Sequence, residues 1–293
     1  MTLPQHDPAW LERMYNNRAL VPDHADYFDR WARESAVVRA SQPCMLDMAY
    51  GPGAGETLDV FEPAHPTAGR APVLVFIHGG YWRSLDKSDH SFIAPVFTQA
   101  GFCVVVVNYA LCPGTPEAPV TVAHIGRQME KALAWVWRNA ESHGGDPRRI
   151  TVAGHSAGGQ LAAMLMTSVW PMIEAGLPDS LVRSALSISG VHDLEPLRYT
   201  PFLQQALHLT EQQVLQCSPA RLLEPPAARL FCAVGGDESP EFQRQNQLMQ
   251  EAWGSHCVPR SVVLPGLNHF SILDALVRPG HDLHHMALNL LRS

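Results

Sequence analysis

The sequence predicts an α/β fold in which a doubly wound, mostly parallel sheet carries helices on both faces. Short runs of strand length recur along most of the chain, and they are apolar throughout, as parallel strands buried on both faces require. Segments whose apolar residues follow helical spacing lie between these runs. This alternation is typical of a parallel sheet covered by helices. The expected strands are Val73–Ile77, Cys103–Asn108, Ile150–Ala153, Ala185–Ser189, Leu230–Val234 and Ser261–Leu264.

Two strands and a helical segment are expected before this alternation begins. The strands are Met45–Tyr50 and Leu58–Glu62, joined by a glycine-rich turn, and residues 1–44 contain one or two short helices. The chain shows no repeat, no low-complexity stretch and no linker, so residues 1–293 are predicted to form a single domain. The expected helices of the later part are Val122–Asn139, Ala157–Val169, Pro240–Trp253 and His281–Leu291.

Residues 192–226 interrupt the alternation of strands and helices. They contain two short segments that favour helix, Pro201–Leu207 and Glu211–Cys217, and they end in Glu224-Pro225-Pro226. An insertion after the carboxyl end of a strand lies beside the edge at which open α/β sheets bind ligands. We therefore expect a small lid insertion over the functional site.

The composition is that of a globular protein with an acidic net charge. Hydrophobic residues make up 46% of the chain, charged residues make up 17%, and the net charge is -7. Such a surface gives no electrostatic reason to bind nucleic acid or an anionic membrane, and the most apolar runs are too short to span a bilayer. The expected partner is therefore a small molecule, with a homodimer left open.

The first residues and the cysteines favour a cytoplasmic location. Met1–Asp7 has neither the basic segment nor the apolar segment of a secretory leader. The six cysteines include no C-x-x-C pair, and several lie in apolar runs, where a thiol behaves as a small hydrophobic group. We expect them to be reduced thiols.

A candidate nucleophile lies between an expected strand and an expected helix. Gly154-His155-Ser156-Ala157-Gly158 is a G-x-S-x-G sequence that directly follows Ile150–Ala153. In this context the motif forms a sharp turn that exposes the serine, and the flanking glycines are needed because the backbone passes too close for side chains. The helix that follows directs its positive end towards a developing oxyanion. Ser156 is therefore the predicted nucleophile.

A second glycine-containing turn, His78-Gly79-Gly80-Tyr81-Trp82, follows the strand Val73–Ile77. The loop that supplies backbone N–H groups to an oxyanion hole is expected upstream of the nucleophile, and glycine lets the backbone approach the anion closely. The candidate donors are the N–H groups of Gly80, Tyr81 and Ala157.

The base and its acid are expected after the last two strands, in the chain order serine, acid, histidine. His269 lies in the loop after Ser261–Leu264, where the base belongs, and it is selected by position among 15 histidines. After Leu230–Val234 two carboxylates compete for the role of acid. The usual register favours Glu238, whereas Asp237 is the more usual residue type, so both remain candidates.

A metal site is the weaker interpretation of the histidines near the C-terminus. His281, His284 and His285 fall in an expected helix, and no carboxylate-rich motif accompanies them. A solvated helix face is the favoured explanation of the three histidines, so we expect no metal there.

These motifs resemble those of kynurenine formamidase (arylformamidase) and its esterase relatives within the α/β-hydrolase superfamily. The HGG-x-W pattern of His78–Trp82 is the first match, whereas related lipases have HGGG. The resemblance covers about residues 45 to 290. Further matches are Ser189–Leu197, Ser218-Pro219, Ser239–Phe242 and Asn268–Phe270.

The resemblance implies an α/β-hydrolase fold and hydrolysis of aryl formamides or small carboxylic esters through an acyl-enzyme, without a cofactor. It again selects Glu238 as the acid, because the family's acid directly precedes the segment that Ser239–Phe242 matches. Since that acid is often aspartate, Asp237 stays open. A kynurenine-type substrate carries a carboxylate, which Arg83 or Arg198 would be suited to bind.

Aromatic residues beside these loops are candidates for substrate binding. Trp82 and Phe270 are the first choices, and Tyr81 and Phe202 are neighbours in the same loops or in the lid. The alternatives to an esterase or arylformamidase are a hydrolase of another acylated aromatic amide, a metal-dependent hydrolase, and a non-catalytic receptor with this fold. The receptor is disfavoured because serine, histidine and acid are all available.

Overall fold

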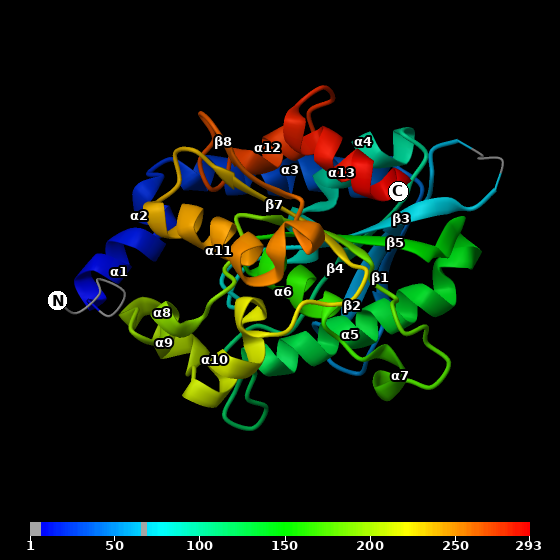
Figure 1. Cartoon of the computed structure of the whole chain (residues 1–293). Coiled ribbons are helices and arrows are strands. Elements are labelled where there is room, and N and C mark those ends of the chain that lie inside the picture. The colour runs from blue at the N-terminus through cyan, green and yellow to red at the C-terminus, as the bar shows by residue number, and fades with distance from the viewer. Residues whose placement is uncertain (1–6, 66–68) are drawn as a thin grey trace.

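The computed structural model describes residues 7–65 and 69–293. In these ranges eight strands form one sheet in the order β1-β2-β4-β3-β5-β6-β7-β8 (Figure 1). β2 pairs antiparallel with both β1 and β4, and all the other pairs are parallel. The mostly parallel sheet predicted from the sequence is thereby confirmed. The strands are β1 (Cys44–Ala49), β2 (Thr57–Phe61), β3 (Ala71–Ile77), β4 (Cys103–Val107), β5 (Gly145–His155), β6 (Ser184–Ile188), β7 (Arg229–Gly235) and β8 (Arg260–Leu264).

The chain order of the strands reverses across β3, which pairs with β4 on one side and with β5 on the other. In an open α/β sheet, ligands bind beyond the carboxyl ends of the strands at such a switch point. The loops after β3 and β5 are those that carry His78–Trp82 and Ser156. The topology therefore brings the two predicted glycine motifs to the same edge.

Helices cover both faces of the sheet, because the central strands are buried on each side (Figure 1). Two separate apolar clusters form, one on each face. One face is covered by α5 (Val122–Asn139), α6 (Ala157–Met166) and α11 (Pro240–Cys257), and the other by α3 (His24–Ser41), α4 (Ala94–Gln99), α12 (Ile272–Leu276) and α13 (Asp282–Arg292).

Most helix bounds agree with the sequence pattern to within one residue, and two differ by more. α6 ends at Met166, before the expected Val169, and the separate short helix α7 (Trp170–Ile173) follows. α11 continues past Trp253 through Gly254, whose φ of 71° allows a kink that other residues adopt less readily. No helix in the described ranges combines the length and the hydropathy needed to cross a bilayer. Single turns of 3-10 helix are η2 (Lys87–Asp89), η3 (Ser91–Ile93), η4 (Ala140–His143) and η5 (Pro219–Arg221).

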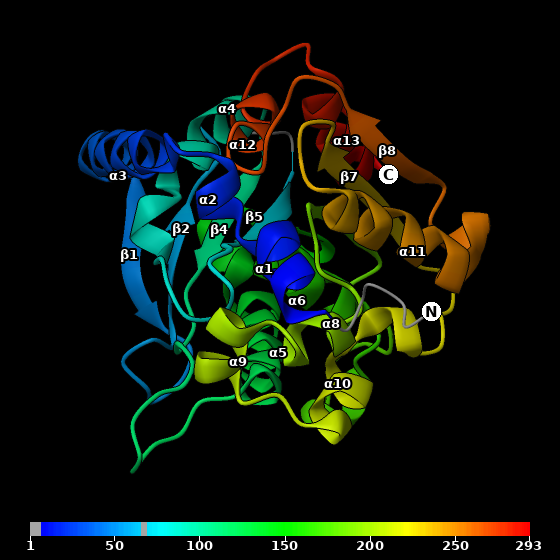
Figure 2. The same ribbon diagram turned by 90° about the vertical axis from the view of Figure 1, so that its left-hand side faces the viewer.

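Two helical segments lie over the carboxyl edge of the sheet, as Figure 2 shows. The first is the N-terminal pair α1 (Pro8–Tyr15) and α2 (Asn17–Leu20). The second is the predicted insertion, which contains α8 (Glu195–Arg198), α9 (Pro201–Leu207) and α10 (Glu211–Cys217). α1 contacts both α9 and α11. The N-terminal segment is therefore part of the cover over the predicted site.

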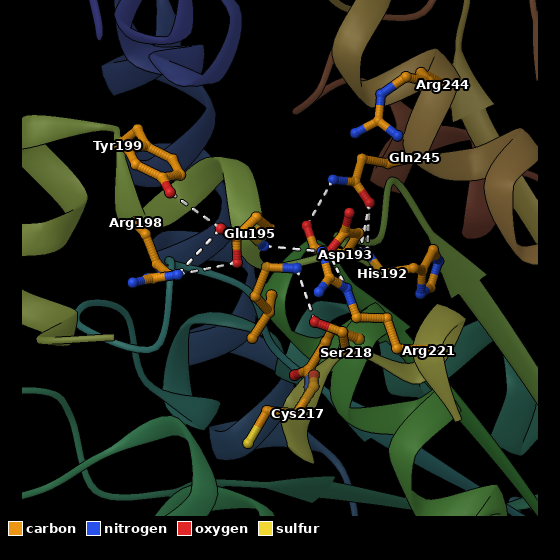
Figure 3. A network of polar contacts seen from close by, with 12 residues as sticks. His192, Asp193, Glu195, Arg198, Tyr199, Cys217, Ser218, Arg221, Arg244 and Gln245 are labelled. Carbon is orange, nitrogen blue, oxygen red and sulfur yellow. Dashed lines mark hydrogen bonds and ion pairs between the residues drawn. The ribbon is translucent and has the colours of Figure 1, made fainter. Parts of the chain in front are cut away.

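The cover is fixed by buried polar contacts. The hydroxyl of Tyr15, a fully buried residue of α1, donates to Oε2 of Glu241 at 2.7 Å. Gln245 of α11 accepts from the backbone N–H groups of His192 and Asp193, each at 2.8 Å (Figure 3). Its side chain also donates to the Tyr15 hydroxyl at 3.0 Å. A single glutamine thus joins α1 to the start of the 192–226 segment.

Candidate active site

Ser156 lies on a sharp turn between β5 and α6. Its backbone has φ 56° and ψ −116°, outside the regions that L-residues favour, and its N–H donates to the carbonyl oxygen of Ile188 at 2.8 Å. The strained backbone at this position is the geometry expected of an exposed nucleophile. The structure thus forms the turn predicted from G-x-S-x-G.

The flanking glycines are required by close backbone contacts. A Cβ at Gly154 would lie 2.0 Å from the carbonyl oxygen of Gly158, and a Cβ at Gly158 would lie 2.0 Å from that of Ile77. Both distances are far below van der Waals contact. The two glycines therefore allow α6 to begin directly against β3 and β5.

His269 and Glu238 form a buried hydrogen-bonded pair. The Nδ1–H of His269 donates to Oε2 of Glu238 at 2.6 Å, and both side chains are almost completely buried. Because Nδ1 carries the proton, Nε2 of the neutral ring is free to accept another. Asp237, the rival acid, is exposed, so the structure brings Glu238 and not Asp237 to the histidine.

Glu238 is itself held by two donors on its other oxygen. The Gly235 N–H donates to Oε1 at 2.8 Å, and the Ser189 hydroxyl donates to the same atom at 2.5 Å. Ser189 follows β6 and has φ 51°. No role for Ser189 was predicted from the sequence. One signal in the sequence could have identified Ser189: it directly follows β6, and β6 pairs with β7, the strand that precedes Glu238.

The three residues come from the ends of three different strands and meet at one edge. Ser156, Glu238 and His269 follow β5, β7 and β8. Ser156 and His269 both line a cavity of about 170 Å³. A cavity of this size accommodates a single aromatic ring, since an engineered cavity of similar volume binds benzene.

The loop after β3 supplies the expected backbone donors. Gly80, Tyr81 and Trp82 have φ values of 103°, 52° and 56°, and a Cβ at Gly80 would lie 2.1 Å from the Ser84 carbonyl oxygen. Gly80 and Tyr81 line the cavity, and within the described ranges their N–H groups have no hydrogen-bond partner. The N–H of Ala157, at the first position of α6, is likewise unused there. This geometry can receive an oxyanion.

Two buried aromatic rings hold this loop. The Tyr109 hydroxyl lies 3.0 Å from the carbonyl oxygens of both His78 and Gly79. The rings of His78 and Tyr109 stack, with centroids 4.2 Å apart and an interplanar angle of 10°. Burial lowers the pKa of His78 below its usual value. These contacts fix the two carbonyl groups directly before Gly80 and Tyr81, which line the cavity.

Several aromatic side chains line the cavity, and those of Phe28 and Trp31 were not anticipated from the sequence. Phe270 lines it, as predicted, and Phe202 of α9 contributes from the insertion. Phe28 and Trp31 of α3 also line it, and Phe28 lies edge-on to Phe270 with centroids 5.3 Å apart. No motif marks these N-terminal residues, because they reach the site only through packing.

Trp82, predicted as a substrate contact, is a buried core residue instead. Its side chain is fully buried in the core, its Nε1 donates to Oε1 of Gln160 at 3.2 Å, and it is not among the described residues that line the cavity. Gln160 in turn donates to the Cys217 carbonyl oxygen at 2.7 Å. Trp82 thus joins the loop after β3 to α6 and α10.

The arginines and histidines named from the sequence are placed as follows. Arg198 donates to Glu195 at 3.1 Å (Figure 3) and lies outside the described lining of the cavity, whereas Arg83 lines it.

The histidines near the C-terminus form hydrogen bonds within their own segment. His281 accepts from the backbone N–H of Leu283 at the start of α13. The His284 ring donates to the Leu276 carbonyl oxygen at 2.9 Å. Within the described ranges, no three or more metal-binding side chains converge.

Fold and site together define a hydrolase with the α/β-hydrolase fold, and comparisons with known proteins agree. The BD-FAE family model matches residues 58–215, more than half of the chain, and the protein belongs to this family.

Curated relatives include kynurenine formamidases and esterases, which confirms the predicted resemblance. The kynurenine formamidase of Danio rerio is 29% identical over 260 residues, covering 86% of this chain and 84% of that protein. The esterase LipQ of Mycobacterium tuberculosis is 35% identical over 154 residues, covering 50% of this chain and 35% of that protein.

Solved structures show the same fold. A proposed thioesterase from Silicibacter sp. TM1040 superposes with a TM-score of 0.81 at 29% identity, covering 97% of this chain and 99% of that one. An esterase of Pyrobaculum calidifontis superposes with a TM-score of 0.65 at 19% identity, covering 90% of this chain and 91% of that one. The second similarity is evidence for the fold alone.

Proposed function

We propose that the protein hydrolyses small carboxylic esters and aryl formamides through a covalent acyl-enzyme on Ser156. The observation that carries this proposal is that Ser156 and His269 line the same cavity, while His269 is hydrogen-bonded to Glu238 at 2.6 Å. The names of the formamidase and esterase relatives support the same class of substrate.

In the first half of the reaction, Nε2 of His269 takes the Ser156 proton while Oγ attacks the carbonyl carbon. The carbonyl oxygen becomes an oxyanion, which the N–H groups of Gly80, Tyr81 and Ala157 stabilise. His269 then returns its proton to the leaving nitrogen or oxygen, the bond to the leaving group breaks, and a formyl or acyl ester of Ser156 remains.

In the second half, water replaces the leaving group. His269 takes a proton from the water, the resulting hydroxide attacks the acyl ester, and the Ser156 oxygen receives the proton as the carboxylic acid departs. Glu238 holds the ring in the tautomer that both halves require and stabilises the imidazolium. The proposed chemistry uses no metal and no cofactor.

The test compares N-formylkynurenine with a short-chain aryl ester as substrates of the wild type and of Ser156→Ala. We expect turnover of at least one substrate by the wild type, and a loss of about 10³-fold or more in Ser156→Ala. A much higher kcat/KM on the formamide would support the arylformamidase activity. Turnover of the ester alone would support an esterase, and undiminished turnover by Ser156→Ala would refute the mechanism.

The cysteines support a reducing compartment. All six are free thiols, and burial raises the pKa of the Cys103 thiol to about 12 and that of Cys217 to about 11. Reduced, unreactive thiols are usual in the cytoplasm, so we propose that location. The homodimer stays a prediction.

A further inference from the structure

The side chain of Tyr81 ties the loop after β3 to the N-terminal helix α1. Its hydroxyl donates to the backbone oxygen of Tyr15 at 2.6 Å, and its ring lies edge-on to Phe202, with centroids 6.1 Å apart. α1 ends at Tyr15, and the last carbonyl groups of a helix have no partner within that helix. The carbonyl group of Tyr15 is therefore available to the Tyr81 hydroxyl.

The backbone of this loop needs support from outside it. Tyr81 and Trp82 have φ values of 52° and 56°, in the left-handed region, which costs L-residues free energy unless surrounding contacts impose it. The buried ring of Trp82 and its hydrogen bond to Gln160 supply such a contact. At Tyr81 the hydrogen bond to Tyr15 supplies it. The side chain of Tyr81 thus helps to hold the backbone of the residue whose N–H is a candidate oxyanion donor.

Tyr15 is itself fixed to α11 by buried contacts. Its hydroxyl donates to Glu241 at 2.7 Å and accepts from Gln245 at 3.0 Å, and its side chain is fully buried. Burial and the Glu241 carboxylate raise the pKa of Tyr15 well above its usual value, and burial and the Glu238 carboxylate do the same to the pKa of Tyr81. Both hydroxyl groups therefore keep their protons at neutral pH and remain donors.

α11 continues the connection to the base. Phe242 lies in the first turn of α11, and its ring is fully buried. The centroid of this ring lies 5.7 Å from that of Tyr15 and 4.7 Å from that of His269. Tyr15 therefore contacts the loop after β3 through its carbonyl oxygen and reaches the base through one intervening ring.

We propose that Tyr15 and Tyr81 are positioning residues for the hydrolysis, whose hydrogen bond holds the backbone donors of the loop after β3 at a fixed place relative to His269. This role rests on the proposed function and adds to it a helix that no motif in the sequence marks. A displacement of about 1 Å in an active site costs up to about 100-fold in rate. A loop released from α1 would still bind the substrate but would stabilise the oxyanion less well.

The kinetic test uses Tyr81→Phe, which removes only the hydroxyl and keeps the ring. On a short-chain aryl ester we expect kcat to fall by about tenfold while KM changes by less than about twofold, because the oxyanion forms only after the substrate has bound. Tyr199→Phe is the matched control, since it removes a hydroxyl that contacts Glu195 outside the described wall of the cavity (Figure 3). Equal losses of kcat in the two variants, or a rise in KM alone in Tyr81→Phe, would overturn the positioning role.

Hydrogen exchange separates this inference from the proposed chemistry, because it needs no turnover. The N–H groups of Arg83 and Ser84 both donate to the Gly80 carbonyl oxygen at 3.1 Å, so their exchange reports the opening of the loop. In Tyr81→Phe and in Tyr15→Phe these two amides should exchange about tenfold faster than in the wild type, whereas the control variant should leave them unchanged. This result would support the link between α1 and the loop even if no ester or formamide is cleaved, in which case the proposed function alone fails. Unchanged exchange in Tyr81→Phe would overturn the link.

Discussion

The ring of His155 lies 2.8 Å from the backbone oxygen of His269, so the residue next to the nucleophile holds the loop of the base. Nε2–H of His155 is the donor, since a carbonyl oxygen only accepts. Burial and the neighbouring His269 lower the pKa of His155 well below its usual value, so the ring is neutral. The motif that positions Ser156 therefore also positions His269.

His155→Leu is expected to lower kcat by about tenfold or more, because the base moves relative to the nucleophile. It should also lower the free energy of unfolding by about 1–3 kcal/mol, since the His269 carbonyl group is left without a donor. Steady-state kinetics and denaturant unfolding measure the two effects. His155→Gln keeps an N–H donor and should retain more of the activity; equal losses in both variants would count against this role.

Glu238→Gln is expected to lower kcat by about 10²–10⁴-fold, because the amide can hold neither the required tautomer nor the imidazolium charge. Asp237→Asn is the matched control, since this neighbouring carboxylate is exposed. Its activity should stay within about threefold of the wild type. Measurements of kcat on the two purified variants decide between the two carboxylates. A larger loss in Asp237→Asn than in Glu238→Gln would assign the role of acid to Asp237.

Ser189→Ala is expected to lower kcat by about three- to tenfold with little change in KM, because Glu238 loses the 2.5 Å hydrogen bond that orients it. Ser187→Ala removes a buried hydroxyl from the same segment, one that contacts His192 and not Glu238. It should affect stability more than kcat. A similar loss of kcat in both variants would mean that Ser189 acts only through folding.

Stability is expected to fall as the pH drops below about 6.5, because buried histidines stay neutral in the folded state. Burial lowers the pKa of His90 and of His192 to about 3 each. Between pH 3 and 6.5 the unfolded chain binds protons that the folded chain does not, so acid favours unfolding. Above pH 6.5 both states are neutral and this effect vanishes.

Each of these histidines should reduce the free energy of unfolding by about 1 kcal/mol between pH 7.5 and 5.5. Denaturant unfolding at the two pH values measures this loss of stability. In His192→Asn the loss should be smaller by about 1 kcal/mol, because one of the two histidines no longer contributes. A pH dependence that is unchanged in His192→Asn would show that this residue is protonated in the folded protein.

The loop and strand pattern of the sequence was enough to predict the sheet and the nucleophile. Continuous apolar runs mark buried parallel strands wherever they occur, and the glycines of G-x-S-x-G report a close backbone approach that only this turn requires. The structure accordingly places Ser156 where it was expected and brings His269, after the last strand, to the same cavity. The apolar runs and the glycine-flanked turn are local patterns, and each of them is compatible with only one local structure.

Packing decided the choice between neighbouring or similar residues. Glu238 and Asp237 are adjacent, but only the turn after β7 determines which carboxylate points inward to His269. Trp82 resembles a substrate contact in sequence and is a core residue in the fold. A sequence lists side chains without the direction in which they point.

The sequence by itself determined the fold class, and it was enough to propose the nucleophile and the position of the base, because these predictions follow from strand length, helix spacing and turn sterics. Only the tertiary structure showed that Arg83 lines the cavity, with no ion pair in the described part of the chain, while Arg198 is bound to Glu195. Only it showed that Arg18 and Phe28 of the N-terminal segment complete the wall. The reason is physical: local forces shape a turn or a strand, whereas burial and ion pairing depend on segments that meet only when the chain has folded.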